Sequence, residues 1–322
     1  MLKYYMAFLL ALLLGILLSF PILKLSKKFH LSQTILHYVD KHAGKSGTPT
    51  MGGLIFIFAI IFSSLFFLQG QILNSILALA TMFGYGLLGF LDDFIKVKFH
   101  KNEGLKPYQK IIGQVGLSLI FAIYVYLNIG GKLEFFGLKI DIVFFIIPFI
   151  VFFFVAVTNS VNLIDGLDGL AGGVNSAYFL FFGFILILLG FEQYALLCFA
   201  CVGALLAFLI VNCFPAKIFM GDTGSLALGG LMASIAVLSS TELLMPIIGF
   251  VFVVTVLSDI LQVAYYKKTH KRIFLMAPLH HHFEKKGVHE NRIVFVYILI
   301  TLVLGLIVFL SYMALTGVIC YV

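Results

Sequence analysis

Long apolar segments alternate with short polar ones along the whole chain. About 20 apolar residues cross the hydrocarbon core of a bilayer as a helix, and a helix pairs its backbone groups within the segment. The residue-by-residue alternation of a membrane β-barrel is absent from these segments. The pattern predicts ten transmembrane helices, at residues 2–23, 52–69, 74–91, 111–129, 142–158, 174–190, 195–211, 225–240, 244–265 and 293–315.

The composition supports this interpretation. The chain has 322 residues, of which 62% are hydrophobic and 11% are charged, whereas a soluble domain is about 25% charged. We therefore expect an all-α polytopic membrane protein in which residues 1–322 form a single integral membrane domain. The first apolar run, from Tyr4 to Leu18, lacks a strongly basic start and an A-x-A cleavage site, so we expect a retained span and not a removed signal peptide.

The basic residues are distributed very unequally between the two faces that ten spans define. The net charge of +7 does not indicate a nucleic-acid partner, because Lys and Arg in a membrane protein first report topology. The loops at 24–51, 92–110, 159–173, 212–224 and 266–292 share one face. They hold all 21 Lys and Arg except Lys3, Lys132 and Lys139. The positive-inside rule places these loops in the cytoplasm and both termini in the periplasm.

The remaining loops are short, and residues 130–141 are predicted to form a small hairpin around Gly137. All nine histidines and most acids lie in the predicted cytoplasmic loops or at the adjoining ends of spans. We therefore expect an active site at the cytoplasmic membrane surface. Cys198 and Cys201 form a C-x-x-C inside an apolar run, where packing is a better interpretation than redox or metal chemistry.

The polar stretch 158–173 is central to the chain. It contains Asn159, Asn162, Asp165 and Asp168 with four glycines, has no Lys or Arg, and lies between two apolar segments. Carboxylates without basic partners at the end of a span are costly and indicate function; the alternative is a solvated turn. If the stretch is helical, the three-residue spacing from Asn162 to Asp168 gives one polar face, suited to the hydroxyls of a nucleotide.

Asp92 and Asp93 follow the third predicted span. Two acids there suit a metal ion, or a base with its orienting partner. The alternative is a polar helix end, but an Asp at a helix C-terminus opposes the macrodipole. The loop 45–53 combines Lys45 and Thr50 with glycines before a helix, which indicates either an anion site or an ordinary capped entry.

Two further polar loops carry candidate chemistry. Asn212, Lys217, Phe219 and Asp222 share one short loop, where a carboxylate for Mg²⁺, a cation for phosphate and a ring for stacking fit a nucleoside diphosphate; N-capping by Asp222 is the alternative. The three histidines at 280–282 cannot all face one metal on a helix, so phosphate binding or proton transfer fits them better than zinc. Together these loops suggest Mg²⁺-dependent phosphoryl chemistry on a lipid.

Five motifs in order resemble the polyprenyl-phosphate sugar-1-phosphate transferases. They are TPTMGG at 48–53, LDD at 91–93, NSVNLIDGLDGL at 159–170, FMGDTGS at 219–225 and PLHHHFE at 278–284. The triple histidine followed by Phe-Glu looks like the phospho-N-acetylmuramoyl-pentapeptide transferase branch. Ile164 departs from the family pattern, which has a polar Thr there in many members. The resemblance covers nearly the whole chain.

The resemblance implies a ten-helix fold in the bacterial inner membrane and a homodimer. It implies transfer of phospho-N-acetylmuramoyl-pentapeptide from its UDP carrier to undecaprenyl phosphate with Mg²⁺, giving lipid I and UMP. Asp222 would then be the metal ligand, and the catalytic residues would be Asp92, Asp93, Asp222 and His281. The substrate-binding residues would be Lys45, Thr50, Asn159, Asn162, Asp165, Asp168, Asn212, Phe219, Gln262, His280 and His282.

Three alternatives stay open at this point. A relative that transfers N-acetylglucosamine-1-phosphate would share the Asp motifs and differ in the triple-His and sugar-binding loops. An ion-coupled transporter would place ionisable residues near the bilayer midplane, where this chain offers only Asp259. Within the predicted reaction, direct attack by the lipid phosphate and a two-step route through an aspartyl intermediate are both compatible with the sequence.

Overall fold

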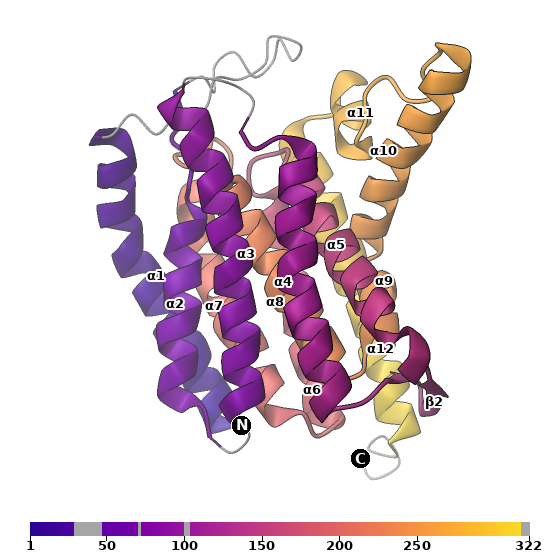
Figure 1. Ribbon diagram of the computed structural model, residues 1–322. Coiled ribbons are helices and arrows are strands. Elements are labelled where there is room, and N and C mark those ends of the chain that lie inside the picture. The colour runs from indigo at the N-terminus through magenta and orange to yellow at the C-terminus, as the bar shows by residue number, and fades with distance from the viewer. Residues whose placement is uncertain (29–46, 70–71, 100–103, 317–322) are drawn as a thin grey trace.

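A bundle of near-parallel helices makes up almost the whole molecule (Figure 1). The computed structural model describes residues 1–28, 47–69, 72–99 and 104–316; Lys45 lies outside them. The long helices are α1 (Leu2–Lys28), α2 (Gly53–Phe67), α3 (Ile72–Lys98), α4 (Pro107–Asn128), α5 (Ile146–Ile164), α6 (Leu170–Leu188), α7 (Glu192–Asn212), α8 (Gly221–Leu238), α10 (Phe250–Thr269) and α12 (Glu290–Leu315). The shorter elements are η2 (Val143–Phe145), η3 (Glu242–Leu244), α9 (Met245–Ile248), α11 (Leu279–Lys285) and the strands β1 (Lys132–Phe135) and β2 (Leu138–Asp141).

Each of the ten apolar segments contains most of one long helix, so the polytopic all-α class is confirmed. Among the described residues, nine helices are long and apolar enough to cross a membrane, whereas α2 has 15 residues. At about 1.5 Å per residue α2 is shorter than the ~30 Å hydrocarbon core. The exact number of ten spans therefore stays a prediction.

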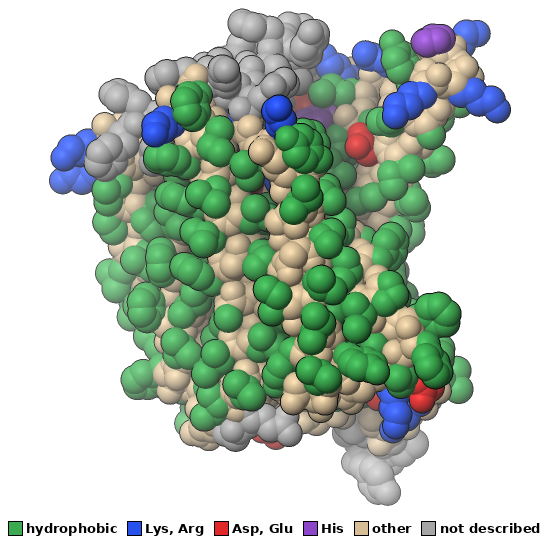
Figure 2. Space-filling model, viewed as in Figure 1, with side chains coloured by type: hydrophobic (Ala, Val, Ile, Leu, Met, Phe, Trp, Pro, Cys, Tyr) green, Lys and Arg blue, Asp and Glu red, His purple; other side chains and the backbone are tan. Residues whose placement is uncertain are grey.

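The two ends of the bundle differ in what they carry. The start of α1, the last turn of α12 and the β1–β2 hairpin lie at the lower end in Figure 1, and α11 and the end of α10 lie at the upper end. The hairpin confirms the prediction at 130–141: Phe135 pairs with Leu138 around the turn. Hydrophobic side chains cover the flank between the ends, and most visible Lys and Arg gather at the upper end (Figure 2).

Three helices form the centre of the bundle. In α6, α7 and α8, 78%, 83% and 89% of the most apolar 18 residues are buried, against 22–44% in the other spans. Small residues on α8 allow this close packing: a Cβ on Gly229 would meet the backbone of Thr158, and one on Gly230 would meet the ring of Tyr85. The polar ends of α3, α5 and α8 are thereby brought together at the upper end.

Several predicted helix boundaries are wrong in ways that matter for the site. The α3 helix continues past Asp92 and Asp93 to Lys98, so the two acids are not at its end and the dipole argument for them does not apply. The predicted helix over 142–158 extends to Ile164 and includes Asn159. The predicted helix over 244–265 is interrupted at Gly249, which separates α9 from α10.

Candidate active site

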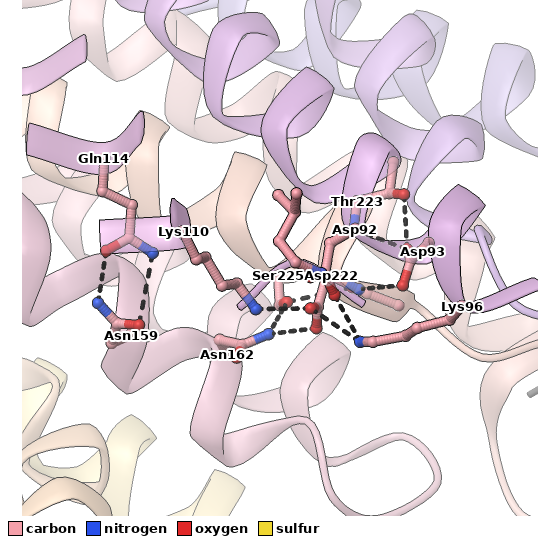
Figure 3. Close-up of polar contacts among 12 residues, drawn as sticks. Asp92, Asp93, Lys96, Lys110, Gln114, Asn159, Asn162, Asp222, Thr223 and Ser225 are labelled. Atoms are coloured by element: carbon pink, nitrogen blue, oxygen red, sulfur yellow. Dashed lines mark hydrogen bonds and ion pairs between the residues drawn. The ribbon is translucent and has the colours of Figure 1, made fainter. Parts of the chain in front are cut away.

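Three carboxylates from two helices meet at the upper end of the bundle (Figure 3). Asp92 and Asp93 lie on α3, and Asp222 lies in the first turn of α8, where the sequence left N-capping open; each offers an oxygen, and these oxygens lie within 4.8 Å of one another. The meeting depends on Gly89, where an added Cβ would strike the backbone of Asp222 and Thr223. Only a residue without a side chain lets α3 and α8 approach this closely.

Asp93 holds the beginning of α8. It is fully buried; its Oδ1 accepts the Asp222 N–H at 3.2 Å, and its Oδ2 accepts the Thr223 N–H at 2.9 Å and the Thr223 hydroxyl at 2.7 Å. The first N–H groups of a helix have no partner inside it and carry partial positive charge, so a buried carboxylate is well suited to them. In the structure, Asp93 therefore positions Asp222.

Asp222 has a different set of partners, including two lysines for which the sequence indicated only a role in membrane topology. Its Oδ2 lies 2.6 Å from Lys110 Nζ and 3.1 Å from Lys96 Nζ, and its Oδ1 accepts a hydrogen bond of 2.7 Å from Asn162 (Figure 3). Lys96 also lies 2.6 Å from Asp92 Oδ2. The four-residue spacing of Asp92 and Lys96 on one helix was a sequence signal for the ion pair between them. Nothing in the sequence predicts the ion pair of Lys110 with Asp222.

The donor set fits Mg²⁺. This ion takes oxygen ligands and is usually bound by one or two carboxylates together with substrate phosphates. Asp93 is committed to the backbone of α8, whereas Asp92 and Asp222 face lysine ammonium groups. Asp222 and Asp92 are therefore the residues that would hold the ion.

Asp165 lies directly after α5, beside this cluster. Burial of its carboxyl raises the pKa to about 8, and the negative charges of Asp222 and Asp93 add to the effect, while a hydrogen bond from the Gly221 N–H opposes it. At neutral pH the group is therefore protonated in most molecules. A neutral carboxyl can donate a hydrogen bond as well as accept one, which suits contact with a hydroxyl or a phosphate oxygen.

The stretch 165–169 is a turn, and the single polar helical face considered for it does not form. Asp168 accepts a hydrogen bond of 3.0 Å from the Ala216 N–H, and its own N–H donates to Glu290 Oε1 at 2.6 Å. Asn212 accepts from the Gly169 N–H at 3.1 Å and donates to the Ile218 carbonyl at 2.9 Å. In the structure these side chains connect three loops, and their contact with a nucleotide stays a prediction.

Other predicted binding residues also have internal partners. Asn159 exchanges hydrogen bonds with Gln114 of α4, at 2.7 and 3.4 Å. Gln262 accepts from the N–H groups of Ile273 and Phe274, at 3.0 Å each, and so holds the chain after α10.

The loop before α2 is joined to the loop before α8. The Phe219 N–H donates to Pro49 and the Phe219 carbonyl accepts from Gly52, both at 2.8 Å. The buried hydroxyl of Thr50 lies beside Gly221, where a Cβ would meet it. Thr50 and Phe219 thus lie close to Asp222, and their contact with a substrate stays a prediction.

The three histidines lie on the short helix α11, and they point to different partners. His280 is buried, its Nε2 lies against Gly166, and burial followed by the charge of His281 lowers its pKa to about 3. His281 Nδ1 lies 3.0 Å from Glu284, and His282 Nδ1 accepts the Leu275 N–H at 3.0 Å. The divergence agrees with the expectation that they do not bind one metal. His280 and His281 approach the turn that contains Asp165.

Comparison with known proteins gives a consistent result. Residues 75–240 match Glycosyl transferase family 4, and residues 45–57 match the Phospho-N-acetylmuramoyl-pentapeptide-transferase signature 1. A protein of Clostridium perfringens strain 13 named Phospho-N-acetylmuramoyl-pentapeptide-transferase is 45% identical over 96% of this chain and 98% of its own length. Proteins of the same name are each 43% identical: that of Desulfitobacterium hafniense over 96% of both chains, and that of Clostridioides difficile over 93% of both.

The similarity extends over nearly the full length of both chains, and it includes the segments that carry Asp92, Asp93, Asn162 and Asp222. The resemblance stated from five motifs is thereby confirmed, and it favours the predicted transferase over a transporter. This chain belongs to the phospho-N-acetylmuramoyl-pentapeptide-transferase family, within Glycosyl transferase family 4.

Proposed function

We propose that this protein transfers phospho-N-acetylmuramoyl-pentapeptide from UDP-N-acetylmuramoyl-pentapeptide to undecaprenyl phosphate, with Mg²⁺, and forms lipid I and UMP. The observation that carries the proposal is the cluster of Asp92, Asp93 and Asp222 beside two lysines, in a chain 45% identical to a transferase of that name. Carboxylates for a divalent ion and cations for phosphates are the groups that phosphoryl transfer between two anionic substrates needs.

The carboxylates and the lysines of the cluster would have different roles in the reaction. Mg²⁺ held by Asp222 and Asp92 would neutralise the diphosphate and the charge that develops on the departing UMP. Lys96 and Lys110 lie beside these carboxylates and would bind phosphate oxygens, and Asn162 orients Asp222 by its hydrogen bond of 2.7 Å. A phosphate monoester has a second pKa of about 6, so the acceptor is largely a dianion at neutral pH. A general base for the acceptor is then not required, and positioning becomes the main requirement both for direct attack and for a route through an aspartyl intermediate.

The lipid tail has an apolar groove available next to the site. A groove of about 560 Å³ runs between α5 and α10, with Phe149, Phe153, Leu257 and Ile260 among its lining residues and Asn159 also on its wall. Asn159 lies one turn before Asn162, the partner of Asp222. A tail in this groove would place the attached phosphate close to the carboxylate cluster.

The orientation and the assembly belong to the same proposal. The concentration of Lys and Arg in the loops at the upper end supports a cytoplasmic active site in the bacterial inner membrane. Protection of engineered cysteines in those loops from an impermeant thiol reagent in intact cells would test it. The homodimer implied by the resemblance stays a prediction, which the mass of the solubilised protein tests.

Release of UMP by the purified protein is the direct test. With undecaprenyl phosphate and Mg²⁺, we expect UMP from UDP-N-acetylmuramoyl-pentapeptide and little from UDP-N-acetylglucosamine; the reverse preference would establish the N-acetylglucosamine-1-phosphate alternative. Asp222→Ala should abolish release while the protein still elutes as a folded species. Release at the normal rate in that variant, or in the presence of a chelator, would contradict the assignment of the metal ligand.

A further inference from the structure

Two lysines from different helices contact the carboxylate that the proposed reaction needs for its metal ion. Lys110 comes from the first turn of α4 and Lys96 from the last turn of α3, and both reach Asp222 Oδ2, at 2.6 and 3.1 Å. The other oxygen of Asp222 is bonded to Asn162. The Lys96 and Lys110 side chains are 18% and 17% exposed, against 14% for Asp222, so the three groups are mostly buried together but not closed off from solvent.

A divalent ion and these ammonium groups cannot share the oxygen. Mg²⁺ binds oxygen at about 2.0–2.1 Å, so an ion on Asp222 Oδ2 would lie within a few ångströms of two ammonium groups already there. Like charges at such distances repel strongly in a partly buried site. Binding of the ion therefore requires that the lysines leave Asp222.

The exchange is balanced in charge. Two ammonium groups carry the same charge as one divalent ion, so the carboxylates stay neutralised before and after. A lysine ammonium is carried on a flexible four-carbon stem, and it can swing to another anion without movement of its helix. The phosphates of the two substrates are such anions, and they would enter next to Asp92 and Asp222.

We propose that Lys96 and Lys110 guard the metal site: they occupy Asp222 in the free protein and move to substrate phosphates when these bind. The inference rests on the proposed function, because the phosphates are those of its substrates. Phosphate binding then removes the competitor of the ion, and the ion in turn releases lysines for the phosphates. By linkage, each ligand tightens the binding of the other by the same factor, and the free protein binds the ion weakly.

Binding of Mn²⁺, followed by its electron paramagnetic resonance signal, tests the guard without turnover. The full-length protein in detergent is titrated with Mn²⁺ in the presence and absence of UMP, with the Mn²⁺ held by free UMP measured separately. We expect UMP to lower the dissociation constant of Mn²⁺ about fivefold or more, which is the effect of removing one ion pair worth ~1 kcal/mol. An Mn²⁺ affinity that is independent of UMP in the unmodified protein would overturn the proposal.

Variants show whether the lysines are the cause. In the absence of UMP, Lys110→Gln should bind Mn²⁺ at least about fivefold more tightly than the unmodified protein does. UMP should then increase the Mn²⁺ affinity of this variant by a smaller factor. Lys106→Gln is the matched control: it removes the same charge from an exposed side chain just before α4, and it should bind Mn²⁺ as the unmodified protein does. Equal Mn²⁺ affinity in the two variants would refute the guard. Absence of UMP release with an intact Mn²⁺–UMP linkage would instead count against the proposed function alone.

Discussion

Gly89→Ala is expected to inactivate the protein by separating two helices. A Cβ on Gly89 would lie 2.6 Å from the Thr223 nitrogen and closer still to the Asp222 carbonyl, whereas ordinary contacts begin at 3.4 Å. Both obstructing groups are backbone, so they cannot rotate away. The α3 and α8 helices must then part by about 1 Å, and overpacking of this kind costs about 1–3 kcal/mol.

The separation also breaks the bonds that position Asp222. The hydrogen bonds from Thr223 to Asp93 are 2.9 and 2.7 Å, and the one from the Asp222 N–H is 3.2 Å. A shift of about 1 Å lengthens all three beyond a useful distance, and each bond to a charged group contributes about 1.5–3 kcal/mol. A displacement of that size at reacting groups lowers a rate by about 100-fold. We therefore expect at least that loss in UMP release, with a lower midpoint of thermal unfolding.

Gly84→Ala on the same helix is the matched control. Its Cβ would meet only the flexible methyl groups of Leu117, at 3.3 and 3.7 Å, and alanine is the better helix former by about 1 kcal/mol. UMP release and thermal unfolding are measured for both variants in the same detergent. If Gly89→Ala keeps the rate of Gly84→Ala, the close approach of α3 and α8 does not position the carboxylates.

Three further predictions concern groups around the same cluster. Glu290→Ala leaves the buried Asp168 N–H without its acceptor, which costs about 1–3 kcal/mol, and should raise the KM for the nucleotide. Glu290→Gln still offers an oxygen to this N–H and should keep the KM of the unmodified protein. Steady-state kinetics of the two variants compares these values. The pKa of His280 is lowered from 6.5 to about 3, so the folded state binds fewer protons and its stability should fall by about 1.4 kcal/mol per unit as pH drops below 6.5; thermal unfolding of His280→Gln should lack this part of the fall. The pKa of Asp165 is raised from 3.8 to about 8, so its contribution to stability is present below pH 3.8 and is lost as pH rises through 8; Asp165→Asn should unfold at a higher temperature than the unmodified protein at pH 8.5 and at an equal one near pH 4.

The sequence predicted the parts of the fold that depend on hydrophobic length. Ten apolar segments gave ten helices, because each must satisfy its backbone within the segment. The hairpin at 132–141 was predictable since Gly137 supplies the positive φ of its turn. The end of α3 was not, because Asp92 and Asp93 look like a polar terminus, whereas in the structure they are buried against α8 and the helix ends only after Lys98.

The sequence identified the residues of the site better than it identified the contacts that they make. Asp93 was expected to be catalytic and Asn212 to bind substrate, and both roles stay predictions; in the structure Asp93 binds the first turn of α8, and Asn212 binds backbone groups of two loops. No spacing within one segment reveals such partners, because they lie far away in the sequence. Glu290 was missed for the same reason: its acidic side chain at the start of a helix is sufficiently explained by the helix dipole, until the Asp168 N–H is seen to donate to it.

Lys96 and Lys110 show that a sufficient explanation from membrane topology can hide a second role of the same residues. Both satisfy the positive-inside rule, and membrane topology requires nothing more of them. That rule, however, acts on the charge of a whole loop and is indifferent to which positions carry it, so Lys106 would serve topology as well as Lys110 does. The contact of Lys110 with Asp222 at 2.6 Å is specific to its position. The difference in Mn²⁺ affinity between Lys110→Gln and Lys106→Gln therefore measures the effect of the position of the lysine, separately from the effect of its charge. The proposed guarding of the metal site depends on that difference.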